Sequence, residues 1–168
     1  MPATATEAER HQKHWDEIVR DPALRDLPYK VETNEQGQLV LSPHKTYHSR
    51  QQKALLTLLD RLLPEGEAFP EYPIATSEGV KQTDVIWVSR ERQQEMEKTE
   101  DPPTRAPEIC VEVMSDANSD EEMREKRRLY RDAGAEEVWI VNSEGHVQFF
   151  AEVELDQSSL APEFPIEV

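Results

Sequence analysis

Apolar residues recur along this chain with two different periods. Three segments place them three or four residues apart, between capping residues and glycine or proline, and this spacing predicts amphipathic helices. Shorter segments of apolar and β-branched residues lie between turn sequences and predict strands. The predicted helices cover residues 6–19, 44–63 and 119–134, and the predicted strands cover a hairpin at 31–41 and residues 69–75, 83–88, 109–114, 137–141 and 146–152.

The strand at 109–114, the helix at 119–134 and the strand at 137–141 predict a βαβ unit, whose crossover helix lies over the sheet. The whole order of helix, hairpin, helix, several strands, helix and hairpin predicts an α/β fold, with a mixed sheet flanked by helices. Residues 89–106 are polar and end in DPPTRA, which predicts a loop with a helical turn around residues 92–98.

Charged residues stand at three positions that this pattern assigns to the core. Glu112 lies in the middle of an apolar strand, where an ionised carboxylate is costly unless it is paired or bound to a metal. In the following helix, Lys126 lies on the same stripe as Met123 and Tyr130. Asp84 opens another apolar strand. The helix follows the strand directly, so we expect the lysine to reach the glutamate.

Two interpretations of these charges remain open from spacing alone. Two carboxylates at the ends of neighbouring strands would hold Mg²⁺, which prefers oxygen ligands and keeps several waters. The lysine would then orient a water or offset charge on a phosphate. The same residues are equally consistent with a buried ion pair between Glu112 and Lys126, with Asp84 as a cap at the end of its strand.

Composition bounds the class of protein. The 168 residues predict one domain. A net charge of −16, from 35 acidic and 19 basic residues, argues against a general nucleic-acid binder. Five basic residues between 124 and 131 nevertheless allow a local basic surface or a solvated helix face.

The single cysteine, Cys110, excludes a disulfide framework and a thiolate zinc cluster. No secretory signal and no membrane-spanning apolar run is visible, so we expect a soluble cytoplasmic protein.

Several linked motifs appear in order between residues 22 and 168. They are LPYKVETNEQGQLVLSP, HSRQ, IATSEGVKQTDVIWVS, APEICVEVMSDANS, EMREKRRLYRDAGAEEVWIV and GHVQFF. With these motifs the chain resembles the Uma2 family, also called DUF820, of restriction-endonuclease-like proteins in the PD-(D/E)XK nuclease superfamily. The resemblance implies a PD-(D/E)XK core of α+β type. It divides the chain into an N-terminal helical extension at 1–21 and a Uma2-type domain at 22–168.

The resemblance also implies roles for the misplaced charges. Asp84 and Glu112 match the two acidic positions that bind the metal, Mg²⁺ with Mn²⁺ as a substitute. Val113 would add its backbone carbonyl as a ligand. Lys126 matches the catalytic lysine, which this family carries on the helix after the strand.

Two further polar positions of the family are matched by Glu32 and His48, which the resemblance places next to the metal. The chain departs from the superfamily pattern at two positions. Thr83 stands where the superfamily name has proline. Met114 stands two residues after the glutamate, where the superfamily name has lysine, so that activity would depend on the lysine of the helix.

The activity implied by the resemblance is that of a Mg²⁺-dependent endonuclease that hydrolyses phosphodiester bonds of DNA. We expect a homodimer, because two cuts across a duplex need two sites. The alternative is a catalytically silent binding or assembly module with a nuclease fold, which the net charge favours because it weakens attraction to DNA. The candidate nucleic-acid contacts are Lys45, Arg50, Arg124 and Arg127.

Overall fold

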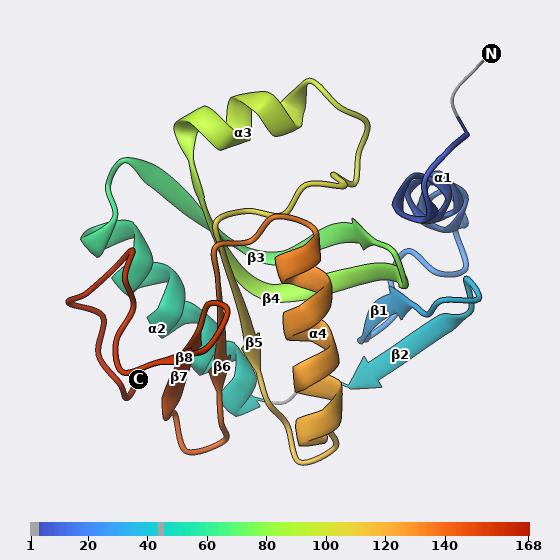
Figure 1. The fold of residues 1–168 in the computed structure, drawn as a ribbon. Helices are drawn as coiled ribbons and strands as arrows, with labels where there is room; N and C mark the ends of the chain where they lie inside the picture. Colours follow the sequence, from blue (N-terminus) through green and yellow to red (C-terminus); the bar gives the residue numbers. More distant parts are fainter. Residues whose placement is uncertain (1–3, 44–45) are drawn as a thin grey trace.

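The computed structural model of the chain describes residues 4–43 and 46–168. These ranges form one six-stranded sheet, a separate two-stranded hairpin and four helices (Figure 1). The helices are α1 (Glu7–Val19), α2 (Thr46–Leu62), α3 (Arg90–Glu97) and α4 (Asp120–Asp132). The strands are β1 (Tyr29–Thr33), β2 (Leu39–Pro43), β3 (Gly66–Thr76), β4 (Gly79–Ser89), β5 (Ile109–Val113), β6 (Glu137–Val141), β7 (Val147–Phe150) and β8 (Glu154–Leu155).

The strands of the large sheet lie in their sequence order, from β3 to β8. Strands β5 and β6 are parallel and are connected through α4, so the predicted βαβ unit is confirmed. The other neighbouring pairs are antiparallel. Short turns join β3 to β4, β6 to β7 and β7 to β8, whereas α3 lies between β4 and β5. The mixed sheet with flanking helices confirms the predicted α/β class.

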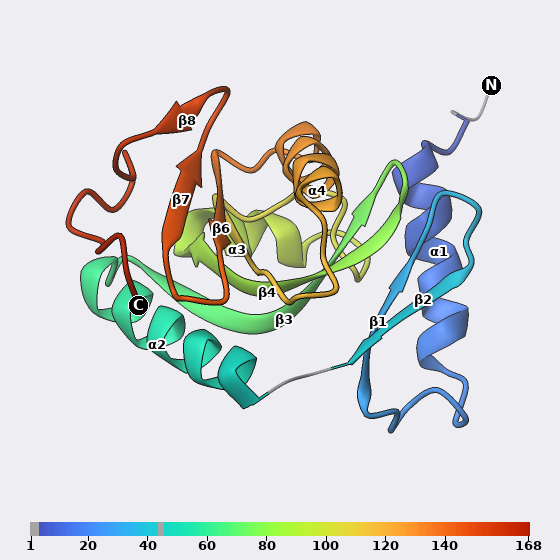
Figure 2. The same ribbon diagram turned by 90° about the horizontal axis from the view of Figure 1, so that it is seen from below.

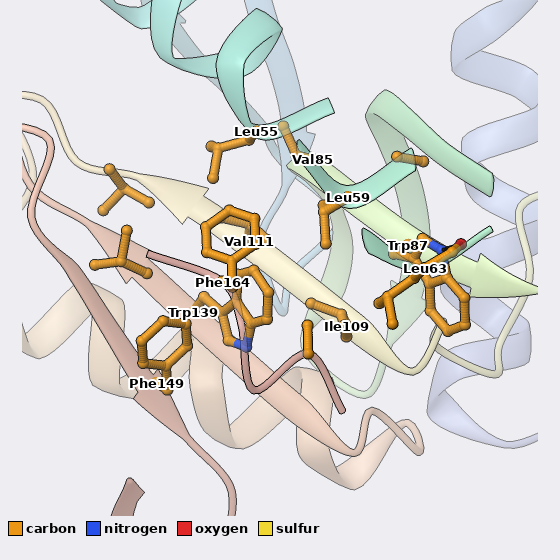
Figure 3. Packing of buried hydrophobic residues seen from close by; sticks show 14 of the residues in the cluster. Leu55, Leu59, Leu63, Val85, Trp87, Ile109, Val111, Trp139, Phe149 and Phe164 are labelled. Atoms are coloured by element: carbon orange, nitrogen blue, oxygen red, sulfur yellow. Dashed lines mark hydrogen bonds between the residues drawn. The ribbon is translucent and has the colours of Figure 1, made fainter. Parts of the chain in front are cut away.

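One face of the sheet packs against α2, and the other packs against α3 and α4 (Figure 2). Because side chains alternate along a strand, β5 sends Ile109 and Val111 to the first face and Cys110 to the second. Leu55 and Leu59 of α2 cover the first face, together with aromatic residues of the later strands and the C-terminal segment (Figure 3). Burial on both faces explains why β5 is apolar at every position except Glu112.

The second face is where the charged residues of the sequence pattern lie. Met123 and Tyr130 of α4 pack there against Ile86, Cys110 and Ile140. Alternation along β4 and β5 puts the side chains of residues 84 and 112 on the side of these α4 residues. The helix stripe that contains Lys126 therefore faces the same part of the sheet.

The β1–β2 hairpin packs at the β3–β4 turn. The backbone N–H of Val80 donates to the Thr33 hydroxyl oxygen at 2.8 Å, and the Lys81 ammonium donates to the Thr33 carbonyl at 2.8 Å. Gly79 has a φ of +105°, and a Cβ at this position would lie 2.2 Å from the Thr33 carbonyl oxygen. Only glycine allows this approach, which brings β1 to the start of β4.

Three predicted boundaries need correction. Residues 90–97 form a two-turn helix, α3, where a loop with a turn at 92–98 was expected; the Ser89 side chain caps it by accepting from the Arg92 N–H. Strands β3 and β4 extend beyond their predicted ends, because their pairing continues to both sides of the apolar centre. The predicted helix at 119–134 is α4, which covers only residues 120–132, because Ser119 is its N-cap and accepts from the Glu122 N–H.

Within the described ranges, the helices are all too short or too polar to cross a membrane.

Candidate active site

Two carboxylates lie side by side where β4 and β5 meet. The antiparallel register that pairs Val85 with Val111 brings Asp84 next to Glu112. Both side chains are 2% exposed. One oxygen of Asp84, Oδ2, accepts a hydrogen bond of 2.7 Å from the backbone N–H of Val113. The structure thus brings together the two acidic residues that the sequence pattern singled out.

Lys126 reaches this pair from α4, but its closest partner is a different carboxylate. Its ammonium nitrogen lies 3.6 Å from Glu112 Oε1 and donates to both oxygens of Glu32, at 3.1 and 3.2 Å. The Tyr130 hydroxyl, one turn further along the helix, donates to Glu112 Oε1 at 2.6 Å. A simple Glu112–Lys126 ion pair is therefore an incomplete description, and Tyr130 has a polar role that the apolar stripe did not reveal.

The two polar residues suggested by the resemblance also border the carboxylates. Glu32 of β1 accepts a hydrogen bond of 2.8 Å from the Gln82 backbone N–H, which fixes it against the start of β4. His48, in the first turn of α2, has its Nε2 3.2 Å from Asp84 Oδ1. Four separate parts of the fold, the hairpin, the sheet, α2 and α4, thus supply groups to one site.

Lys30 is a member of this site that the sequence reasoning missed. Its ammonium donates to Asp84 Oδ1 at 3.0 Å and to Glu112 Oε2 at 3.3 Å, and it lies 4.0 Å from Glu32 Oε2. The side chain is buried. Strand alternation was the available signal, because Lys30 precedes Glu32 by two residues and so shares its face.

These groups border a cavity of about 320 Å³. Its walls come from the hairpin, the first turn of α2, the middle of β4, the end of β5, the loop after β5 and the side of α4. They include Lys30, Glu32, His48, Asp84, Glu112 and Lys126. A cavity of mixed apolar and polar lining that gathers buried ionisable groups is the usual form of a catalytic or binding site.

The carboxylates ionise differently because their surroundings differ. Burial raises the pKa of Glu112 to about 7, against the opposing effects of the Lys126 and Lys30 ammoniums. Burial would also raise the pKa of Asp84, but the Lys30 ammonium and the His48 contact outweigh it and hold that pKa below its usual range. Burial likewise opposes ionisation of Glu32, and Lys126 and Lys30 overcome it, so the pKa of Glu32 is lowered.

Three carboxylates therefore face two ammoniums, and Glu112 is the carboxylate that most favours an added positive charge. A proton or a metal cation would satisfy it. Asp84 and Glu112 offer oxygen ligands of the kind that Mg²⁺ binds with waters completing its coordination, so the pair fits that ion. Across residues 4–43 and 46–168, however, His, Cys, Asp and Glu side chains form no group of three or more arranged to hold a metal.

The candidate nucleic-acid contacts lie elsewhere. Arg124 and Arg127 line a separate hollow of about 410 Å³ beside Phe150, and the Arg127 guanidinium carbon lies 3.8 Å from the centre of the Phe150 ring. Arg50 is exposed on α2. None of these three lines the cavity of the carboxylates. Lys45 lies outside the described residues.

Comparisons with known proteins identify a family and a shared fold. The family model Uma2, described as "Putative restriction endonuclease", matches residues 15–163. A solved structure from Anabaena variabilis ATCC 29413, described as a "putative nuclease belonging to DUF820", is similar with a TM-score of 0.71 at 16% identity. The match covers 90% of this chain and 93% of that one, and at this identity it shows a shared fold. A search of the curated proteins finds no match.

Proposed function

Because the chain belongs to the Uma2 family of restriction-endonuclease-like proteins, we propose that it is a Mg²⁺-dependent endonuclease acting on DNA. One observation carries the proposal: Asp84 and Glu112 are adjacent and buried at a cavity, with the Lys126 ammonium 3.6 Å from Glu112. Two carboxylates and a lysine on a nuclease fold are suited to hydrolysis of a phosphodiester bond.

Each residue has a role in this proposal. Asp84 and Glu112 would bind Mg²⁺ or Mn²⁺, with the Val113 carbonyl as a further ligand. The bound cation would supply Lewis acidity and lower the pKa of a coordinated water. Lys126 would hold the attacking water or offset negative charge at the phosphate. Glu32 keeps the Lys126 ammonium at the site through two hydrogen bonds.

The groups around the carboxylates would keep them in position. His48 contacts Asp84 Oδ1, and the Val113 N–H holds the other oxygen of Asp84. Tyr130 holds Glu112 Oε1. These contacts fix the directions of the carboxylate oxygens before a substrate arrives, which lowers the cost of organising the site.

A second function, a catalytically silent module with a nuclease fold, is favoured by one specific contact. Lys30 already pairs with both Asp84 and Glu112, as in a structural ion network. The net charge of −16 also opposes long-range attraction to DNA.

Calorimetric titration with Mg²⁺ and Mn²⁺ tests the metal site. Wild type should bind the metals, Asp84→Asn should lose binding, and the exposed Asp132→Asn should bind like wild type. The same proteins should then be incubated with linear, supercoiled, single-stranded and branched DNA in the presence of Mn²⁺. Absence of metal binding by wild type, or equal binding by Asp84→Asn, would refute the metal site. Metal binding without cleavage of any substrate would favour the silent module.

Nucleic-acid contacts outside the cavity belong to the same proposal. Arg124 and Arg127, on a hollow beside Phe150, would contact phosphates, as would Arg50 and Lys45. We also propose a homodimer, because cleavage of both strands needs two sites. Light scattering that finds a monomer at micromolar concentration would count against the dimer.

A further inference from the structure

The Lys30 ammonium contacts one oxygen of each proposed metal ligand, Asp84 and Glu112. It is 3.0 Å from Asp84 Oδ1 and 3.3 Å from Glu112 Oε2. Its side chain is buried, and both carboxylates are buried as well. The contact is therefore part of the packed interior of the site and is not made by a mobile, solvent-exposed side chain.

A divalent cation and this ammonium would compete for the same oxygens. Mg²⁺ binds carboxylate oxygens at about 2.1 Å and tolerates little departure from octahedral geometry. An ammonium in contact with the same two oxygens would be a few ångströms away, and in a buried site the repulsion between the two positive charges is poorly screened. Lys126 presents no such conflict, because it donates to Glu32 and lies 3.6 Å from the other oxygen of Glu112.

We propose that Lys30 is a built-in competitor for the divalent cation, which holds Asp84 and Glu112 in the absence of metal and must withdraw before the metal binds both. The inference rests on the proposed function, since it takes these carboxylates as the metal ligands. It identifies Lys30 as the residue that sets the metal affinity of the site.

The surroundings of Lys30 allow such a withdrawal. Its side chain lines the cavity of about 320 Å³, into which it can turn. Glu32 lies 4.0 Å from the ammonium and would remain a partner for it. In the metal-free protein, the ammonium offsets the repulsion between two adjacent carboxylates, so the site is assembled before the metal arrives.

Mn²⁺ titration of three proteins at pH 8 tests the competition. Lys30→Met keeps the length of the side chain and removes the ammonium. Lys81→Met is the matched control, because Lys81 donates to the Thr33 carbonyl on the same hairpin. We expect Lys30→Met to bind Mn²⁺ about tenfold or more tightly than wild type, the scale of a lost hydrogen bond between charged groups. Lys81→Met should bind within about twofold of wild type, because its charge does not contact the ligand oxygens.

The outcomes separate this inference from the proposed function. If Lys30→Met binds Mn²⁺ equally or more weakly than wild type, and Asp84→Asn still abolishes binding, then competition by Lys30 is refuted. The metal site would still be supported. Absence of Asp84-dependent binding in every protein would overturn the metal site itself, and the competitor with it.

A measurement on wild type covers the case in which Lys30→Met does not fold. The lysines of the protein are acetylated with and without saturating Mn²⁺, and mass spectrometry measures the extent of acetylation at each lysine. We expect Lys30 to be protected without metal and to become several-fold more reactive with Mn²⁺, while Lys81 is unchanged. Unchanged protection of Lys30 at saturating Mn²⁺ would overturn the proposal.

Discussion

Replacement of Glu112 by glutamine should change how the stability of the metal-free protein depends on pH. Burial raises the pKa of Glu112 from 4.5 to about 7. Because this folded-state pKa is raised, the stabilisation from the protonated group is fully present below pH 4.5 and is lost as the pH rises through 7. Each pKa unit corresponds to about 1.4 kcal/mol, so the loss is on the order of 3 kcal/mol at pH 8.

A glutamine side chain is neutral throughout this range and can still accept the Tyr130 hydrogen bond. The free energy of unfolding of Glu112→Gln, minus that of wild type, should therefore rise by about 2–3 kcal/mol between pH 5 and pH 8. Urea unfolding in the presence of a chelator, at four pH values, measures this difference in the free energy of unfolding. The slope of that free energy against urea concentration should be the same for both proteins. Glu144→Gln, at an exposed turn residue, is the control.

The opposite sign would refute the reasoning. If Glu112 is chiefly an ion-pair partner of Lys30 and Lys126, then its neutralisation at pH 8 leaves the ammoniums undercompensated. Breaking a buried pair in this way costs about 3 kcal/mol or more, and the variant would be less stable than wild type. A variant that loses stability at pH 8 relative to pH 5 would support the structural ion network.

Three further predictions follow from the contacts of the site and the hairpin. Lys126→Met should lower nuclease activity by about a hundredfold or more in a cleavage assay, and it should also destabilise the protein because Glu32 loses its closest cation. Adding Glu32→Gln to this variant should restore the melting temperature but not cleavage. Full activity of Lys126→Met would exclude a catalytic lysine. Gly79→Ala should cost about 1–3 kcal/mol in urea unfolding, because the residue has a positive φ and its Cβ would meet the Thr33 carbonyl; a neutral result would exclude that close contact. Arg127→Met should weaken DNA binding only slightly in a gel-shift titration, through one lost phosphate contact, and loss of all binding would place the main DNA contact there.

The sequence predicted those parts of the site that depend on local periodicity. The period of two in β5 assigns Glu112 to one face of the sheet, and the period of 3.6 in α4 directs Lys126 to that same face. The resemblance added Glu32 and His48. The helix α3 was missed because its buried surface is limited to Met96, too narrow a stripe to produce a periodic signal.

The partners of these residues could not be predicted, because they depend on contacts between distant segments. Lys30 reaches Asp84 across 54 positions of the chain, and Lys126 reaches Glu32 across 94. Both contacts require the hairpin to pack at the β3–β4 turn, and no local pattern reports that packing. Spacing similarly could not say that Arg127 lies over Phe150, away from the cavity.

The placement of the two lysines ties the hairpin to the rest of the fold. Lys30 extends from β1 to carboxylates of the sheet, and Lys126 extends from α4 to a carboxylate of β1. Each charge pair therefore crosses from one structural unit to another, and together they join the hairpin, the sheet and the crossover helix at the cavity. A cation that replaced the Lys30 ammonium would weaken one of these connections and leave the Lys126–Glu32 connection in place. Divalent metal binding is accordingly expected to alter the hairpin more than the sheet, because the carboxylates of β4 and β5 keep their backbone pairing while β1 loses a partner.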